Sequence, residues 1–255
     1  MCRLLGHVTH TPTTLAGLLG EGDLHQFTEL SCKHGDGWGF ASATDAGIQV
    51  VKAPGAARTG DVFGCHAHTN ATDLRLVHLR WATLGLSVVP ENTHPFTDGT
   101  IAFAHNGSVA PPPALDALIS DELRPLRRGD TDSERYFLAT LANARRTNPV
   151  EGLAATVARI TESYEFSSLN AMIATPEELI AVCRYDPIAQ EKEDEPDYYH
   201  LRIRATPDSV VVSSTGWGSG WGSGWTPLEN GEILVIRPGT LDVSVLSVTD
   251  AQAAR

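Results

Sequence analysis

The order of the secondary-structure signals along the chain constrains the fold more than any other feature. Strand-like segments come first, two helices with clear start signals follow, and strand-like segments then return. Thr131-Asp132-Ser133-Glu134 fits a capping box, in which the first and last residues cap each other's backbone N–H groups. In Asn148-Pro149-Val150-Glu151, Pro149 takes the favoured first helical position. Strands, then helices, then strands again predict an α+β layered fold.

Strands are expected wherever apolar and β-branched residues cluster between turn signals. The turn-rich residues 44–47 predict one hairpin, and residues 168–184 predict a second. Shorter helical candidates lie at residues 15–19 and 114–123. The expected strands cover residues 1–10, 38–43, 48–52, 74–82, 101–105, 168–175, 179–184, 210–214, 233–236 and 241–246.

Length, charge and cysteine usage narrow the class of protein. The 255 residues contain no linker rich enough to divide them, so we expect a single domain over residues 2–255, with 42% hydrophobic residues to fill its core. The net charge of −12 argues against a nucleic-acid partner. No apolar run is long enough to span a bilayer, and residues 1–10 lack a secretory signal. We therefore expect a cytoplasmic protein whose cysteines, at positions 2, 32, 65 and 183, are free thiols.

Residues 216–225 repeat a Trp-Gly-Ser-Gly unit and form the one low-complexity segment of the chain. It fits a local duplication in a surface loop. It also fits an aromatic flap over a site, because exposed tryptophans in a loop tend to contact something. Residues 190–197 are acidic and predict a surface loop.

Cys2 is a candidate nucleophile because of its position. A small second residue favours removal of Met1, which would leave Cys2 with both a thiol and a free α-amine. An α-amine has a pKa of about 7.7–8.0 and can act as a base at neutral pH. A buried cysteine is also an ordinary small apolar residue, so both interpretations stand for Cys2 taken alone.

Polar residues at the ends of predicted elements form a second group of candidates. Arg80 follows a strand and presents a planar fork that matches a carboxylate, although a surface salt bridge would explain it too. The Asn106 amide and the Gly107 N–H are neutral donors of the kind that form an oxyanion hole, and glycine lets the backbone approach a ligand. A plain Asn-Gly turn is the alternative. Asp132 either satisfies the dipole of its helix or holds an ammonium group.

These residues belong to a series of short motifs that resembles the glutaminase domain of class II glutamine amidotransferases, which are N-terminal-nucleophile hydrolases. The series is most similar to the stand-alone bacterial subfamily. The resemblance implies a four-layer α-β-β-α sandwich, with two antiparallel sheets between helices, and requires no metal or cofactor. The motifs are Met1-Cys2-Arg3-Leu4-Leu5-Gly6, Asp36-Gly37-Trp38-Gly39, Arg80-Trp81-Ala82-Thr83, Glu91-Asn92-Thr93-His94-Pro95-Phe96, His105-Asn106-Gly107 and Thr131-Asp132-Ser133-Glu134.

The resemblance also implies a catalytic group. Cys2 would be the nucleophile and its α-amine the general base, acting through water. The Asn106 side chain and the Gly107 N–H would hold the oxyanion. His94 and Asp36 stand in matching motifs, and we interpret them as structural supports.

The same resemblance implies a substrate-binding group that reads both charges of an α-amino acid. Arg80 would hold the α-carboxylate, with Trp81 and Thr83 beside it. Asp132 would hold the α-ammonium, helped by the Gly107 carbonyl. The implied reaction is hydrolysis of the glutamine side-chain amide to glutamate and ammonia through a γ-glutamyl thioester.

Several functional alternatives stay open. Nothing after residue 134 resembles an acceptor domain, so ammonia would be released or passed to a partner protein that carries the acceptor site. A γ-glutamyl amide with a larger amine would fit the same machinery, with the loop at Trp217–Trp225 as a wall for that amine. A non-catalytic binding module would be expected to have lost Cys2, Asn106 or Asp132. Three candidate zinc ligands, Cys65, His66 and His68, lie close together, but we expect no metal site there.

Overall fold

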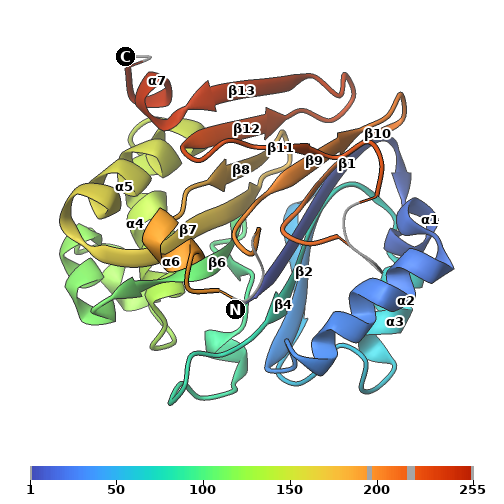
Figure 1. Ribbon diagram of the computed structural model, residues 1–255, viewed down its shortest axis with the longest axis horizontal. Helices are drawn as coiled ribbons and strands as arrows, with labels where there is room; N and C mark the ends of the chain where they lie inside the picture. The colour runs from blue at the N-terminus through green and yellow to red at the C-terminus, as the bar shows by residue number, and fades with distance from the viewer. Residues whose placement is uncertain (1, 194–196, 217–221, 254–255) are drawn as a thin grey trace.

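Two antiparallel sheets face one another in the computed structural model, which describes residues 2–193, 197–216 and 222–253 (Figure 1). We call them sheet A and sheet B. In the described part of the chain, sheet A has seven strands. Their order across the sheet is β11 (Thr226–Pro227), β9 (Arg202–Ala205), β10 (Ser209–Ser213), β1 (Arg3–Thr13), β4 (Thr72–Arg80), β2 (Gly37–Thr44) and β3 (Gly47–Ala53).

Sheet B contains six strands among the described residues. Most of its strands come from the second half of the chain, and β6 pairs with β7 in antiparallel register. The order is β13 (Val243–Ser247), β12 (Glu232–Ile236), β8 (Leu179–Cys183), β7 (Glu165–Ala174), β6 (Ala102–Ala110) and β5 (Phe96–Thr97).

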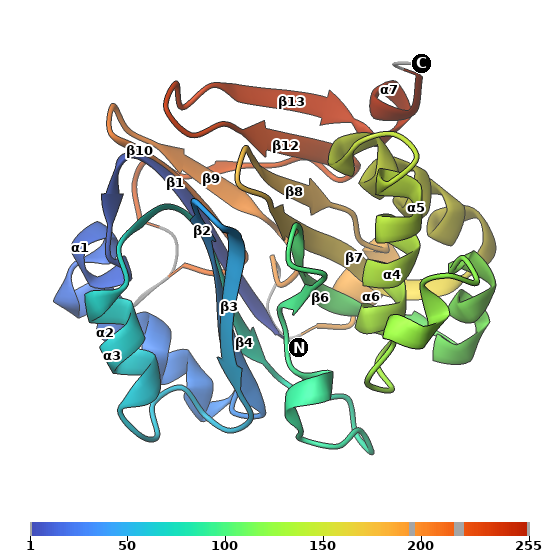
Figure 2. The ribbon, with the colours of Figure 1, turned by 180° about the vertical axis from the view of Figure 1, so that it is seen from behind.

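Helices cover the outer face of each sheet, as the two opposite views show (Figures 1 and 2). Sheet A is covered by α1 (Leu15–Leu19), α2 (Glu21–Glu29) and α3 (Val62–Thr69), and sheet B by α4 (Asp132–Ala144), α5 (Pro149–Ser163) and α7 (Val248–Ala253). The remaining helical segments are α6 (Pro187–Gln190), η1 (Leu30–Cys32), η2 (Pro90–Asn92), η3 (Pro112–Leu118) and η4 (Arg124–Leu126). No helix in the described ranges is long and apolar enough to cross a membrane.

Three hydrophobic cores correspond to the three spaces between these layers. One core lies between sheet A and its helices, and another lies between sheet B and its helices. The third fills the space between the sheets, where Leu4 of β1 and Ala104 of β6 both pack. The predicted α-β-β-α sandwich is therefore confirmed.

The two long helices begin where the capping signals predict. The Thr131 hydroxyl accepts a hydrogen bond from the Glu134 N–H at 3.0 Å, and Asn148 Oδ1 accepts one from the Glu151 N–H at 3.0 Å. Such caps typically contribute about 1 kcal/mol each. The Glu134 carboxylate departs from the capping-box pattern. It reaches beyond the cap residue to the N–H groups of residues 128 and 129, at 2.8 and 2.7 Å, and so ties the preceding loop to the helix.

Several expected boundaries are wrong, for local reasons. The helix expected at 114–123 is the shorter η3, which begins within a run of three prolines at 111–113. Strand β4 ends at Arg80 instead of residue 82. Helices α2 and α3 and strand β9 carried no periodic signal strong enough to be predicted: α2 buries only Leu24 and Phe27, and α3 has eight residues.

Candidate active site

The candidate residues come together at one end of the space between the sheets. Cys2 directly precedes β1 and Arg80 ends β4, and these strands are paired with Arg3 opposite Leu79. Side chains alternate along a strand, so Cys2 lies on the same side as Leu4, which faces the other sheet. Asn106 alternates with Ala104 on β6 and faces sheet A from the opposite side. The fold thus brings distant sequence positions to one place.

The Cys2 thiol is buried, with 8% of the residue exposed. Its Sγ lies 3.4 Å from the backbone nitrogen of Trp81 and 3.7 Å from the carbonyl oxygen of the same residue. Burial raises the pKa of the thiol, while the hydrogen bond from Trp81 and the charge of Arg80 act in the opposite direction. A thiol in this setting needs a base to become a nucleophile.

The Arg80 guanidinium is held by backbone carbonyls through Nη1, and its Nη2 makes no hydrogen bond within the described residues. Only 2% of the residue is exposed. Its Nη1 donates to the carbonyls of Asp36 at 3.3 Å and Ser87 at 3.4 Å, whereas Nη2 has no partner in the described part of the chain. Asp36 also accepts a 2.8 Å hydrogen bond from the Ala82 N–H. These contacts agree with the interpretation of Asp36 as a support for the arginine.

Asn106 is fully buried, and neither Oδ1 nor Nδ2 has a hydrogen-bond partner among the described residues. Leaving a buried polar group unpaired costs about 1–3 kcal/mol, so such a group calls for an explanation. The next residue, Gly107, packs so closely on β7 that an added Cβ would lie 1.9 Å from the Ser168 carbonyl oxygen. The structure therefore requires glycine here for strand packing, whatever its role toward a ligand.

Asp132 is tied to the strand that carries Asn106. Its Oδ2 accepts a 2.7 Å hydrogen bond from the Val109 N–H, at the point where the register of β6 against β7 shifts. The residue is 7% exposed, and its charge acts to raise the pKa of the Cys2 thiol. Asp132 is thus fixed near the thiol, with Oδ1 contacted only by the Ser133 hydroxyl at 3.4 Å among the described residues.

Two of the predicted residues lie outside this buried group. Trp81 is 40% exposed, with its ring edge-on to His34 at 5.7 Å and the Lys33 Nζ 5.1 Å above it. Thr83 is exposed in the loop after β4, where its carbonyl accepts a hydrogen bond from the Leu86 N–H at 3.0 Å. Its place beside the substrate carboxylate stays a prediction.

The motif that contains Gly39 packs against the motif that contains His94, next to the strand that ends at Arg80. A Cβ on Gly39 would lie 2.3 Å from the His94 carbonyl oxygen, so β2 needs glycine to let this segment approach. The His94 ring lies 4.2 Å from the ring of His78, and both residues are buried. Burial lowers the pKa of His78 to about 3 and that of His94 well below its usual range. His78 was missed by sequence reasoning, although its place two residues before Arg80 puts it on the same face of β4.

The alternative zinc ligands find other contacts. Cys65, His66 and His68 lie on α3, and no group of three described histidine, cysteine or acidic side chains could hold a metal ion. His68 Nε2 lies 3.1 Å from the Glu21 carboxylate, and the His66 ring packs on Phe40 at 4.6 Å. The flap proposed at residues 217–225 falls partly outside the described residues, which omit 217–221.

Comparison with known proteins gives consistent results. The family "Glutamine amidotransferases class-II" matches residues 1–255. A Haemophilus influenzae protein named "Putative glutamine amidotransferase" is 31% identical over 193 residues, which cover 72% of this chain but only 63% of that relative. The gamma-glutamyl-hercynylcysteine sulfoxide hydrolase of Mycolicibacterium smegmatis is 24% identical, over 80% of this chain and 83% of that protein.

Solved structures show a similar fold at low sequence identity. A glutamine aminotransferase class-II domain protein from Silicibacter pomeroyi superposes with a TM-score of 0.68 at 21% identity, covering 96% of this chain and 99% of that one. The glutamine phosphoribosylpyrophosphate amidotransferase of B. subtilis also gives a TM-score of 0.68, at 18% identity, but only 49% of that chain is covered.

Proposed function

The chain belongs to the class II glutamine amidotransferases, and on this basis we propose that it hydrolyses the side-chain amide of glutamine to glutamate and ammonia, with Cys2 as nucleophile. The observation that carries the proposal is the set of buried polar atoms without partners beside the thiol. Nη2 of Arg80 and both polar atoms of Asn106 are unpaired in the described part of the chain. Buried groups of this kind are retained where a ligand completes their hydrogen bonds.

The two charged residues recognise the glutamyl end of the substrate. The Arg80 guanidinium binds the α-carboxylate, for which its free Nη2 supplies a donor. Asp132 binds the α-ammonium through Oδ1, since Oδ2 is engaged by the Val109 N–H. An α-amino acid carries one charge of each sign, so the pair reads it specifically.

The chemistry then follows from the thiol. The Cys2 thiolate attacks the side-chain carbonyl carbon, and the resulting oxyanion accepts hydrogen bonds from Asn106 Nδ2 and the Gly107 N–H. The C–N bond breaks, ammonia leaves, and a γ-glutamyl thioester stays on Cys2. Water attacks the thioester, which releases glutamate and returns the thiol.

The base in this scheme is the α-amine of Cys2 after removal of Met1, which makes residues 2–255 the working domain. Burial raises the pKa of the Cys2 thiol, so the thiol does not ionise unaided at neutral pH. The α-amine titrates at about 7.7–8.0 and can take the thiol proton and later give it to the leaving ammonia. The scheme uses no metal or cofactor.

The destination of the ammonia and the cellular setting are also part of the proposal. Ammonia is either released or passed to an acceptor on a partner protein, and the described second half of the chain supplies strands and helices of the sandwich. Cytoplasmic location is supported by all four cysteines being free.

A second candidate substrate is a γ-glutamyl amide with a larger amine. It is favoured by Trp81, whose backbone N–H lies 3.4 Å from the Cys2 Sγ and whose side chain is exposed. An amine larger than ammonia would have an exposed aromatic ring available on the residue whose backbone contacts the thiol. This candidate is also supported by the similarity to the M. smegmatis hydrolase, whose name describes a γ-glutamyl substrate.

The test is glutamate release from glutamine, glutathione and other γ-glutamyl amides, measured as kcat/KM. Cys2→Ala should abolish release from all of them, whereas Cys65→Ala, which alters an exposed thiol, should not. A glutamine-mimicking electrophile should label Cys2 alone. Activity in the Cys2→Ala variant would overturn the mechanism. A hundredfold preference for a bulky γ-glutamyl amide would keep the mechanism and select the second substrate.

A further inference from the structure

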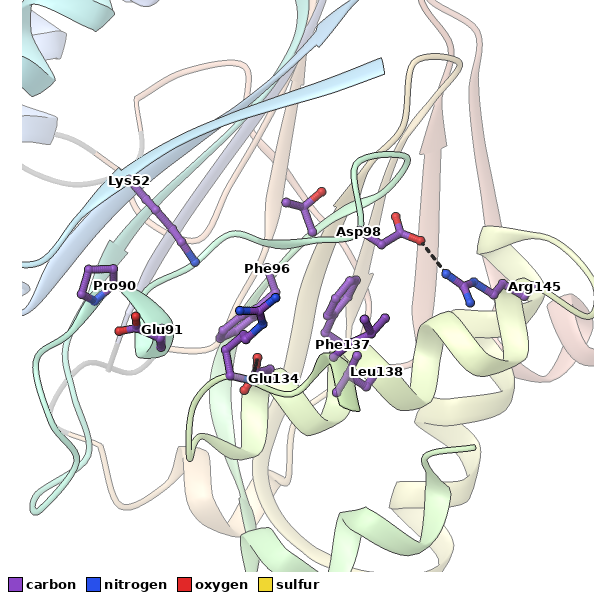
Figure 3. A pocket seen from close by; sticks show the side chains of 12 residues that line it. Lys52, Pro90, Glu91, Phe96, Asp98, Glu134, Phe137, Leu138 and Arg145 are labelled. Atoms are coloured by element: carbon purple, nitrogen blue, oxygen red, sulfur yellow. Dashed lines mark hydrogen bonds and ion pairs between the residues drawn. The ribbon is translucent and has the colours of Figure 1, made fainter. Parts of the chain in front are cut away.

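A cavity of about 530 Å³ opens between the edge of sheet A at β3 and helix α4 (Figure 3). None of the residues that line it belongs to the candidate active site. Its volume lies within the range of small-molecule sites, roughly 300–1,000 Å³. The cavity is therefore large enough for a ligand of its own.

The floor of the cavity is aromatic. Phe96 of β5 and Phe137 of α4 stack with ring centroids 6.3 Å apart and planes 18° from parallel, and each residue is 4% exposed. Leu126 stands at the wall with 42% of its surface exposed. An apolar or aromatic group of a ligand would cover mainly Leu126 above the nearly buried rings, with a gain of roughly 25 cal/mol per Å² buried.

Charges of both signs surround the floor. Asp98 and Arg145 neutralise each other in an ion pair of 3.2 Å, drawn as a dashed line in Figure 3. Lys52, Glu91 and Glu134 also line the cavity, as does the exposed Arg128. Two positive and two negative groups are thus left outside that ion pair, and a ligand with a single charge would meet repulsion from one of the two signs.

Lys52 has a donor to offer. Its Nζ donates to the carbonyls of Thr93 and Pro95, and an ammonium group carries three protons. Burial lowers the pKa of Lys52 to about 8, against the opposing effect of Glu134 and Glu91. The ammonium is thus partly desolvated, faces two carboxylates and lies 5.2 Å from the Phe96 ring.

We propose that this cavity binds a small zwitterion of the amino-acid class that carries an apolar or aromatic side chain. The ligand carboxylate binds Lys52 and Arg128. Its ammonium binds Glu91, and the negative charge of Glu134, whose oxygens are held by the N–H groups of residues 128 and 129, adds to the attraction. The side chain packs on Phe96 and Phe137.

Occupancy of the cavity is linked to the catalytic site by two short routes. Lys52 binds the carbonyls of both neighbours of His94, and the His94 ring contacts the ring of His78, which lies two residues before Arg80 on β4. Helix α4 presents Glu134 to the cavity and carries Asp132 at its first residue. A bound zwitterion should therefore change the KM for the glutamyl substrate more than kcat. This second statement rests on the proposed function, whereas binding itself does not.

Binding can be measured calorimetrically on the full chain with L-phenylalanine as the probe. Phenethylamine and 3-phenylpropionate each lack one of its charges, and glycine lacks the apolar group. We expect saturable binding of L-phenylalanine and an affinity lower by about tenfold or more for the other three. Phenethylamine and 3-phenylpropionate each lose a hydrogen bond between charged groups, which contributes about 1.5–3 kcal/mol. Glycine loses the burial of the apolar group.

Matched variants locate the site. Arg128→Gln and Glu91→Gln alter exposed side chains of the cavity, and each should weaken L-phenylalanine binding about tenfold. Arg146→Gln and Glu122→Gln alter exposed side chains outside the cavity and should have no effect. Arg80→Ala should also leave binding intact. If Arg80→Ala removed binding while Arg128→Gln kept it, the probe would occupy the catalytic site and the proposal would be wrong. Absence of saturable binding at millimolar probe would overturn it as well, and neither result depends on hydrolysis.

Discussion

Two neighbouring asparagines give a sharp test of the oxyanion-hole assignment. Asn106 and Asn170 face each other in the register of β6 and β7, and both are fully buried. Asn170 is satisfied, because its Nδ2 donates to the Tyr199 carbonyl and its Oδ1 accepts from the Arg184 N–H at 2.7 Å. The polar atoms of Asn106 have no partner in the described part of the chain. The two sites therefore match in burial and differ in hydrogen bonding.

Replacing each asparagine by leucine should change stability in opposite directions. Asn170→Leu leaves the buried Tyr199 carbonyl and the partly buried Arg184 N–H unpaired, at a cost of about 1–3 kcal/mol for the buried group. Asn106→Leu removes an amide that gains nothing in the folded protein, so we expect equal or higher stability, by about 1 kcal/mol or roughly 2–4 °C in Tm. Urea and thermal unfolding of the two variants beside the wild type measure the difference.

Replacing Asn106 should lower activity strongly, although it leaves stability unchanged or higher. Removal of one oxyanion donor typically lowers kcat by about 10²–10³, so Asn106→Ala should lose this much with little change in KM. A loss confined to KM would move Asn106 from transition-state stabilisation to substrate recognition. If Asn106→Leu were as destabilising as Asn170→Leu, Asn106 would stabilise the folded protein itself, and the assignment would lose its physical basis.

Three further predictions test other parts of the site and fold. The mature protein should begin at Cys2, and an intact mass that showed full retention of Met1 together with full activity would refute the amine as base. Arg80→Lys should raise KM by about tenfold or more, because an ammonium cannot keep the carbonyl contacts of Nη1 and also present a donor at the position of Nη2. An unchanged KM would remove Arg80 from substrate recognition. Burial, with the charge of Arg75, lowers the pKa of His7 from 6.5 to about 3. The unfolded chain therefore binds the extra proton between these values, and His7 takes away about 1.4 kcal/mol of stability per pH unit as the pH falls from 6.5 toward 3. Urea unfolding of His7→Leu should show a shallower loss over that range, and an identical slope would contradict the burial argument.

Local features of the sequence were sufficient for the parts of the fold that depend on neighbours in the chain. Thr131 and Asn148 cap α4 and α5 as expected, because a capping hydrogen bond spans three residues. The segment at 15–19 is helical with the predicted bounds. The hairpin of β2 and β3 follows from its turn residues in the same way.

Other features were decided by contacts that local patterns do not encode. Helix α2 is largely polar and buries only Leu24 and Phe27, so its sequence shows little helical periodicity. The helix is stabilised by packing of these two residues on sheet A. The Glu134 carboxylate binds the N–H groups of the preceding loop because the loop folds back over α4. The His78 ring contacts the His94 ring only because the His94 segment packs against β2 at Gly39.

The same division applies to the candidate site. The sequence by itself singled out Cys2, Arg80, Asn106 and Asp132 as candidates, through residue types and their order in short motifs. It could not show that Leu5 on β1 pairs with Ser213 on β10, or that the Asp132 carboxylate binds the backbone of β6. Nor could it show that the Asn106 amide is buried without a partner. Pairing of strands that are far apart in the chain depends on which apolar faces find each other, and only the tertiary structure determines that choice.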